Sequence, residues 1–463
     1  MADNRAARGG AAATAIHPFA ARALGALTVA VVLSVLTAAP AWAGGGGGAG
    51  LGGGTGSHPH HPHHPRRAAP SARRRHRPRH HRRAAHPRAA NPLHRRAMWI
   101  WELPDTDGGS LSAIVATAHR YGVRTLIIKS SDGVNPWPQF SATLVDELHA
   151  AHLRVCAWQY VYGDHPGVEA NLGADAVHDG ADCLVIDAES EYEGRYVAAQ
   201  AYVHDLRKQI GARYPVALAG FPYVDYHPAF PYSVFLGPGG AQYDVPQMYW
   251  RDIGTSVSQV FAHTYEFNLP YGRPIDPLGQ IYGNPPMRQI VRFRELARSY
   301  GAGGVSWFDW QSARPRGWTA LSKRTGRLPA ARRPLTMGTV GRGARGDLVV
   351  WIQEHLATAG EGTAVDGAYG RRTQLAVEDF QAAHGLTVDG LVGPQTWAAL
   401  LRYRPLAVRW VRRGRHTVAD ALGARAVAAA ADGGAPLTLP VPATARRPAR
   451  RDEIPAGLGS GRP

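Results

Sequence analysis

A repeated pattern near the C-terminus, Val-Asp-Gly-x-x-Gly-x-x-Thr, constrains the fold most strongly. It runs from Val365 to Thr373 and again from Val388 to Thr396. Asp-Gly pairs favour turns that need a positive φ, and a helix-like stretch follows each copy. Two such turns alternating with short helices predict a small all-α module over residues 346–401.

Three helices are expected in this module. Asp347 is placed to cap the first, Thr373–His384 forms the second and ends at Gly385, and Gln395–Leu401 follows Pro394 as the third. The residues expected to face inward are Leu348, Ile352, Leu356, Leu375, Ala376 and Phe380.

The duplicated motif resembles the peptidoglycan-binding domain found on many secreted cell-wall hydrolases. The resemblance covers residues 346–401 and implies that the protein binds peptidoglycan or a related wall glycan. The Asp-Gly pairs build turns, so the motif identifies the module without showing which residues touch the wall.

The N-terminus predicts export. Arg5, Arg8 and Arg22 precede an apolar run over residues 23–36, and Ala41-Trp42-Ala43 completes a signal-peptide pattern over residues 1–43. The alternative is a membrane anchor, although the apolar run is short for a span of about 20 residues. A secreted, wall-associated monomer is therefore expected.

Positive charge is concentrated outside the central part of the chain. The formal net charge is +17, and residues 66–96 hold twelve arginines and no acid. Residues 44–96 and 402–463 are low in complexity and are expected to be disordered, apart from a strand-like stretch over residues 406–411, with a linker at 323–345. The basic tails could hold the protein on anionic wall polymers or a membrane surface, or act as spacers. They lack interleaved aromatic residues, so nucleic acid is not an expected partner.

The two cysteines, Cys156 and Cys183, fit an exported protein. Both fall on neighbouring expected strands, where they could pair or remain buried thiols. No zinc-type spacing exists, and neither a metal nor another cofactor is expected; the histidines over residues 58–64 would bind metal only adventitiously.

Between residues 97 and 322, short apolar runs alternate with amphipathic stretches. Repeated βα units over this length predict a (β/α)8 barrel, with a doubly wound sheet as the alternative. The expected strands are Met98–Leu103, Thr125–Lys129, Arg154–Tyr160, Cys183–Ala188, Val216–Phe221, Val245–Trp250, Leu278–Tyr282 and Gly304–Trp310. The clearest helical stretches are Ser110–Tyr121, Ala142–His152, Tyr196–Tyr214 and Met287–Tyr300.

Function in such a barrel is expected at the C-terminal ends of the strands. Asp187 and Glu189, at i and i+2, share one face, with Cα atoms about 6.6 Å apart. Two carboxylates this close raise one pKa and suit glycoside hydrolysis, although they could instead pair with a cation or metal. Asp309 and Glu102 offer further carboxylates. The residues expected to bind substrate are Lys129, Asp132, Trp158, Tyr160, Tyr223, Gln247, Tyr249, Trp250, Trp307 and Trp310.

Two strand ends resemble motifs of the glycoside hydrolase family 25 lysozymes. Ile127–Gly133 is similar to that family's strand-two I-K-x-[ST]-[DE]-G, and Ile186–Glu189 is similar to its D-x-E. The resemblance implies that Glu189 is the general acid and Asp187 its partner.

The chain departs from that family at two positions. The aspartate of strand one is absent, and Glu102 follows Met98-Trp99-Ile100-Trp101 instead. Strand six offers Gln247 and Tyr249 in place of an aspartate. Three functions follow: a secreted glycosidase acting on wall glycan, a wall-binding protein with a degenerate barrel, or a surface-attachment protein that works through its basic tails.

Overall fold

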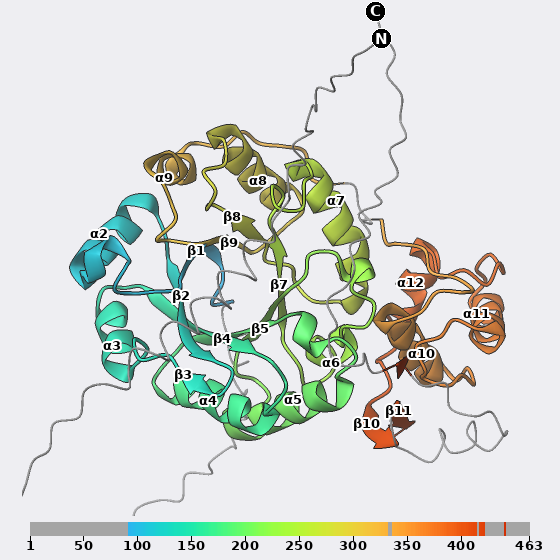
Figure 1. Ribbon diagram of the computed structural model, residues 1–463. Helices are drawn as coiled ribbons and strands as arrows, with labels where there is room; N and C mark the ends of the chain where they lie inside the picture. The colour runs from blue at the N-terminus through green and yellow to red at the C-terminus, as the bar shows by residue number, and fades with distance from the viewer. Residues whose placement is uncertain (1–90, 332–335, 414–415, 422–438, 441–463) are drawn as a thin grey trace, which may run out of the picture. The chain divides into compact units, whose positions relative to one another are not determined.

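The computed structural model describes residues 91–331, 336–413, 416–421 and 439–440 (Figure 1). It contains a closed barrel of parallel strands followed by a helical module, which confirms the predicted fold class. The expected signal peptide, the basic segment up to residue 90 and most of the C-terminal tail lie outside the described residues. The parallel strands are β1 (Arg95–Ile100), β2 (Thr125–Asp132), β4 (Arg154–Val161), β5 (Cys183–Ala188), β6 (Val216–Gly220), β7 (Tyr243–Met248), β8 (Leu278–Gln280) and β9 (Gly304–Phe308).

Strand β1 closes the barrel by pairing on both sides. Ala97 is in register with Thr125 of β2 and with Ser306 of β9. The short β3 (Asn135–Pro136) pairs antiparallel with the end of β2. Side chains fill the interior and helices cover the outside, so β2 is buried at every position. Burial on both faces explains why the sequence shows continuous apolar runs at the strands.

Helices surround the barrel (Figure 1). Serine side chains cap three of them: Ser110, Ser141 and Ser256 each accept a backbone N–H from the first turn. The buried face of α4 consists largely of alanine and glycine, so hydrophobic periodicity does not reveal this helix. The helices are α2 (Leu111–Tyr121), α3 (Ala142–Ala150), α4 (Pro166–His178), α5 (Tyr196–Ile210), α6 (Tyr232–Phe235), α7 (Val257–Asn268), α8 (Met287–Ser299) and α9 (Pro315–Ser322), with 3₁₀ turns η1 (Asp107–Gly109), η2 (Ser190–Tyr192), η3 (Val224–Tyr226) and η4 (Leu269–Tyr271).

The two cysteines form a disulfide inside the barrel. Cys156 of β4 lies opposite Cys183 of β5, with their Cα atoms 4.5 Å apart. Both belong to the interior cluster that also contains Trp99 and Trp158. Of the two alternatives that the sequence left open, the structure shows the paired one.

The helical module consists of α10 (Asp347–Ala359), α11 (Arg371–Ala383) and α12 (Pro394–Leu400). Gly367 and Gly390 of the two Asp-Gly pairs have φ values of 68° and 65°, as the turn chemistry requires. Leu375 was expected to face inward, but it is 45% exposed. The buried face of α11 is instead formed by Thr373, Ala376, Val377 and Phe380.

A glutamine clamps each Asp-Gly turn from the preceding helix. Gln353 donates to Asp366 Oδ1 at 2.9 Å and accepts the backbone N–H groups of Asp366 and Gly367 at 2.9 Å each. Gln381 donates to Asp389 Oδ1 at 2.9 Å and accepts from Asp389 and Gly390 at 3.0 and 2.9 Å. Each copy of the motif is therefore a turn whose backbone N–H groups are held by one glutamine.

The module packs directly against the barrel. Asp347 accepts from the backbone N–H and the hydroxyl of Ser233, both at 2.7 Å, and from the Tyr271 hydroxyl at 2.8 Å. Trp351 donates from its indole to the Pro270 carbonyl at 2.7 Å. The expectation that Asp347 caps α10 is wrong: Gly346 holds the cap position, and the carboxylate turns to the barrel instead.

A strand pair follows the module. β10 (Val408–Arg413) was expected in part from residues 406–411, and β11 (His416–Ala421) pairs with it in antiparallel register. The short β12 (Leu439–Pro440) extends this sheet. Among the described residues, no helix combines the length and apolar character needed to cross a membrane.

Replacing either clamp glutamine by alanine should destabilise the module by about 3 kcal/mol, because buried turn amides would lose their acceptor. Hydrogen exchange of the full chain should then accelerate about 100-fold at Gly367 in Gln353→Ala and at Gly390 in Gln381→Ala. Gln395→Ala is the matched control, since this side chain is exposed on α12. Equal effects in all three variants would contradict the clamp.

Candidate functional site

The site is built at the carboxyl ends of the barrel strands. Strand β5 ends with Asp187 and Ala188, and Glu189 is the next residue. Strand β4 places Trp158 beside them, and β7 contributes Gln247. These predicted residues come together as hydrogen-bonded neighbours.

Asp187 is held firmly within this cluster. Its Oδ2 accepts the indole N–H of Trp158 at 2.9 Å, and its Oδ1 accepts the Gln247 amide at 2.9 Å. It is 5% exposed. Burial raises the pKa of Asp187 well above its usual range and the charge of Glu189 raises it further, while Trp158 and Lys129 act in the opposite direction.

Glu189 shares the same amide. Gln247 Nε2 donates to Glu189 Oε1 at 2.9 Å, so one side-chain amide bridges both carboxyl groups. Glu189 is half-buried and therefore more accessible than Asp187. Burial raises its pKa, the Gln247 hydrogen bond lowers it, and the charge of Glu191 raises it again. The pair thus favours retention of a proton, as a general acid requires.

Lys129 is bound to Asp132 at the end of β2. Its ammonium is fully buried, pairs with the Asp132 carboxylate and lies 4.5, 5.0 and 5.6 Å from the ring centroids of Trp137, Trp158 and Trp101. The buried ammonium and the Asp132 carboxylate thus balance each other's charge. Its charge also reaches Asp187, whose pKa it lowers.

The two further predicted carboxylates flank the barrel closure. Burial raises the pKa of Asp309, which follows β9, and that of Glu102, which follows β1. With its amide nitrogen turned to Asp309, Gln311 donates to Asp309 Oδ2 at 3.1 Å and accepts the backbone N–H of Glu102 at 2.8 Å. The first and last strand ends are therefore joined through one side chain.

Tyr249 lies within the electrostatic reach of three carboxyl groups. Burial is the largest cause of the raised pKa of the Tyr249 hydroxyl. Tyr282 raises this pKa further, and so do the charges of Asp187, Glu189 and Asp309. Tyr160 is also near the pair, and its hydroxyl donates to Glu191 at 3.1 Å.

Four other predicted residues lie elsewhere. Trp250, Trp307 and Trp310 are buried between the barrel and its helices, where Trp250 donates to Gln289 at 3.0 Å and Trp310 packs on Trp318. Tyr223 stacks near His263 of α7, with ring centroids 3.9 Å apart. Asp187 and Glu189 have their described side-chain hydrogen bonds with Trp158 and Gln247 rather than with these four residues.

Several residues of the site were missed from the sequence. Glu191 accepts the hydroxyl of Tyr160. Tyr162 donates to Asp132 Oδ1 at 2.9 Å, and Tyr282 donates to Asp252. Glu191 continues the i, i+2 spacing of Asp187 and Glu189, and that spacing was the available signal. No group of three metal-ligating side chains occurs within the described ranges.

Residues 345–400 match the family described as "Putative peptidoglycan binding domain". This segment is a peptidoglycan-binding domain. The chain is also 40% identical over 63 residues to the zinc D-Ala-D-Ala carboxypeptidase of Streptomyces albus G. These residues make up 13% of this chain and 25% of that protein. It is 47% identical over 57 residues to an uncharacterised protein of Kitasatospora aureofaciens, covering 12% and 48%. The chain thus spans less than half the length of these curated relatives.

Among solved structures, the chain is similar to the SleB N-terminal domain, at 39% identity over 14% of this chain and 90% of that one, with a TM-score of 0.14. It is also similar to the spore cortex-lytic enzyme SleL of Bacillus cereus, at 11% identity over 51% and 76% of the chains, with a TM-score of 0.37.

Gln247→Leu should raise the pKa of the carboxyl pair further, because the two groups lose the hydrogen bond that favours their charged forms. Carboxyl ¹³C titration by NMR should show an upward displacement at Asp187 and Glu189. Gln280→Ala on the neighbouring strand β8 is the control, since its amide bonds Asp252. An unchanged titration in Gln247→Leu would show that the bridge has no electrostatic role.

Proposed function

We propose that this protein is a secreted glycoside hydrolase that cleaves peptidoglycan or a related wall glycan, with Glu189 as general acid. The observation that carries the proposal is the single amide of Gln247 shared by Asp187 and Glu189. It holds two carboxyl groups with raised pKa at the functional end of a (β/α)8 barrel.

The two carboxyl groups are suited to different tasks. Glu189 is the more accessible, so its proton can pass to the glycosidic oxygen as the bond to the leaving sugar breaks. Asp187 is almost fully buried, and each of its oxygens already accepts a hydrogen bond. Both hydrogen bonds favour the ionised form of Asp187, and that form would orient the substrate and stabilise the positive charge of an oxocarbenium-like transition state.

The peptidoglycan-binding domain would bring this chemistry to its substrate. The signal-peptide pattern over residues 1–43 supports export, and the arginine-rich segment would add electrostatic adhesion to anionic polymers. The signal-peptide pattern and the arginine-rich segment, except Arg95 and Arg96 of β1, lie outside the described residues.

A glycan-binding protein without activity is the second candidate, and the position of Glu102 favours it. Burial raises the pKa of Glu102, and its other influences are Trp137, Lys129 and Asp105. No described contact joins Glu102 to Asp187 or Glu189. The strand-one carboxylate therefore does not take part in the carboxyl pair.

Glu189→Gln should reduce turnover by about 10²–10⁴-fold while glycan binding survives, because the amide keeps the shape but cannot donate the acid proton. Asp187→Asn should also lose activity. Release of reducing ends from purified wall is the measurement, and Glu147→Gln, at an exposed position on α3, is the control. If the wild-type protein releases no reducing ends from any wall preparation, hydrolysis is contradicted and the glycan-binding function takes its place.

The pH dependence has a defined sign. Glu189 must be protonated to act, so activity should be present below its pKa and fall as the pH rises through it. Because burial raises that pKa, this fall should occur at a higher pH than for an ordinary glutamate. The kcat/KM profile on a soluble glycan fragment reports this limb. A fall in the usual glutamate range would contradict the assignment of Glu189.

The catalytically silenced full chain, Glu189→Gln, should sediment with purified insoluble peptidoglycan in a larger fraction than the same chain ending at residue 331, which keeps only the barrel and the N-terminal segment. Thermal unfolding of the shortened chain checks that its barrel stays folded. Equal sedimentation of both chains would assign wall retention to the barrel or the N-terminal segment.

A further inference from the structure

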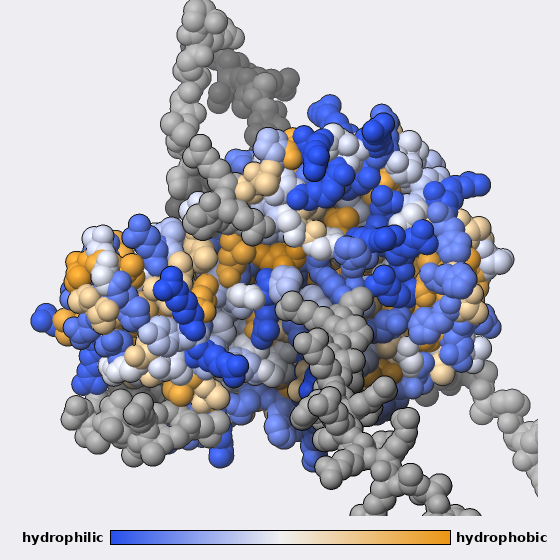
Figure 2. Space-filling view, turned by 180° about the vertical axis from the view of Figure 1, so that it is seen from behind, coloured by the Kyte–Doolittle hydropathy of each residue, from blue (hydrophilic) through white to orange (hydrophobic). Residues whose placement is uncertain are grey.

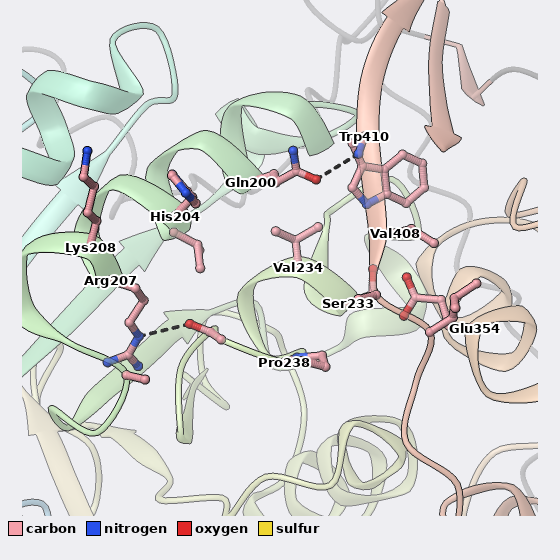
Figure 3. A pocket seen from close by; sticks show the side chains of 15 residues that line it. Gln200, His204, Arg207, Lys208, Ser233, Val234, Pro238, Glu354, Val408 and Trp410 are labelled. Carbon is pink, nitrogen blue, oxygen red and sulfur yellow. Dashed lines mark hydrogen bonds between the residues drawn. The ribbon is translucent and has the colours of Figure 1, made fainter. Parts of the chain in front are cut away.

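A pocket of about 540 Å³ lies where helix α5, helix α6, helix α10 and strand β10 meet (Figure 3). None of its lining residues belongs to the carboxyl cluster of the barrel. Backbone N–H of Trp410 donates to Gln200 Oε1 at 2.8 Å, which holds β10 against α5. The pocket is therefore made jointly by the barrel, the peptidoglycan-binding domain and the strand that follows it.

One wall of the pocket carries a buried acid without a partner. Glu354 of α10 is 3% exposed, and its carboxyl group faces the pocket in Figure 3. Within the described residues, its carboxyl oxygens accept no hydrogen bond and form no ion pair. A buried carboxyl group in this state is costly unless a ligand supplies a donor.

Positive charge occupies the other side, where Arg207 and Lys208 lie in Figure 3. The guanidinium of Arg207 donates only to uncharged oxygens, four carbonyls and the Gln242 side chain. Lys208 is exposed at the same edge, and none of the described carboxylates pairs with either cation. The pocket thus presents an unpaired acid inside and unpaired cations toward its mouth.

The surface between these charges is largely apolar. Aliphatic side chains and one indole separate the acid from the cations, so the pocket suits a chain of methylene groups. These residues are Val203, Val234, Pro238, Leu406, Val408 and Trp410.

We propose that this pocket binds an aliphatic chain carrying an ammonium at its inner end and a carboxylate at its mouth, as a diamino acid at the free C-terminus of an uncrosslinked peptidoglycan stem peptide does. The ammonium would pair with Glu354, the methylene groups would lie against Val234 and Trp410, and the carboxylate would meet Lys208. An entirely anionic polymer would leave Glu354 unpaired, and an apolar ligand would leave all the charges unpaired. The inference concerns binding and does not depend on hydrolysis by the barrel.

The test uses the full-length chain with Glu189→Gln, so that no turnover interferes, and calorimetric titration with 6-aminohexanoate. This probe should bind at least about tenfold more tightly than hexanoate or hexylamine, each of which lacks one charged end. A stem peptide that ends in the diamino acid with a free side-chain amine should displace it, and the same peptide acetylated at that amine should not. Equal affinity for all three small probes would overturn the proposal.

Glu354→Gln removes the charge at nearly constant shape and should weaken binding of 6-aminohexanoate at least about tenfold. Asp379→Asn, at an exposed position of the same domain, is the matched control and should bind as before. Ala407→Trp provides a second variant, because Ala407 is exposed at the pocket and a large side chain there should block entry. Binding that survives both Glu354→Gln and Ala407→Trp would place the ligand elsewhere.

Discussion

Closure of the sheet at β1 is the constraint on which the candidate site depends. The strand is in register with β2 on one side and β9 on the other, so the first and last strands end at the same place. This brings Glu102 and Asp309, far apart in sequence, to the two sides of Gln311. An open sheet would leave Asp309 separate from Tyr249 and the Asp187–Glu189 pair. The arrangement of carboxyl groups is thus a property of the closed barrel rather than of any one motif.

The barrel could be predicted because each βα unit leaves its own local pattern, but the direction of many side chains could not. Strands buried on both faces carry apolar residues on both, so the apolar pattern does not show which alternate residues face the barrel interior. In β9, Phe308 joins the interior cluster and Trp307 packs against the helices. In the same way, Gln247 and Tyr249 face the carboxyl groups while Trp250 faces outward. A polar residue such as Asp187 indicates which side of its strand faces the site, whereas an aromatic residue fits either side.

The repeat in the peptidoglycan-binding domain shows a different limit. Its Asp-Gly turns were predictable, because positive φ at glycine is a local property of the chain. Their support was not, because Gln353 and Gln381 lie on the preceding helices and outside the repeated segments. In both glutamines, the side-chain carbonyl accepts two backbone N–H groups of the turn, and the side-chain NH₂ group donates to the aspartate. Figure 2 shows polar and apolar residues mixed over the visible face of the molecule, so surface character alone would not have located these internal supports.

The disulfide between Cys156 and Cys183 has a consequence for how the barrel responds to a reducing environment. The bond lies inside the barrel, on adjacent strands, and both sulfur-bearing residues are almost inaccessible to solvent. Disulfides of this kind persist in oxidising surroundings and are rare where glutathione keeps thiols reduced. A reductant could reach this bond only through an opening of the strands around it. The barrel interior therefore retains the oxidised state in which it was assembled, even when the redox conditions outside it later change.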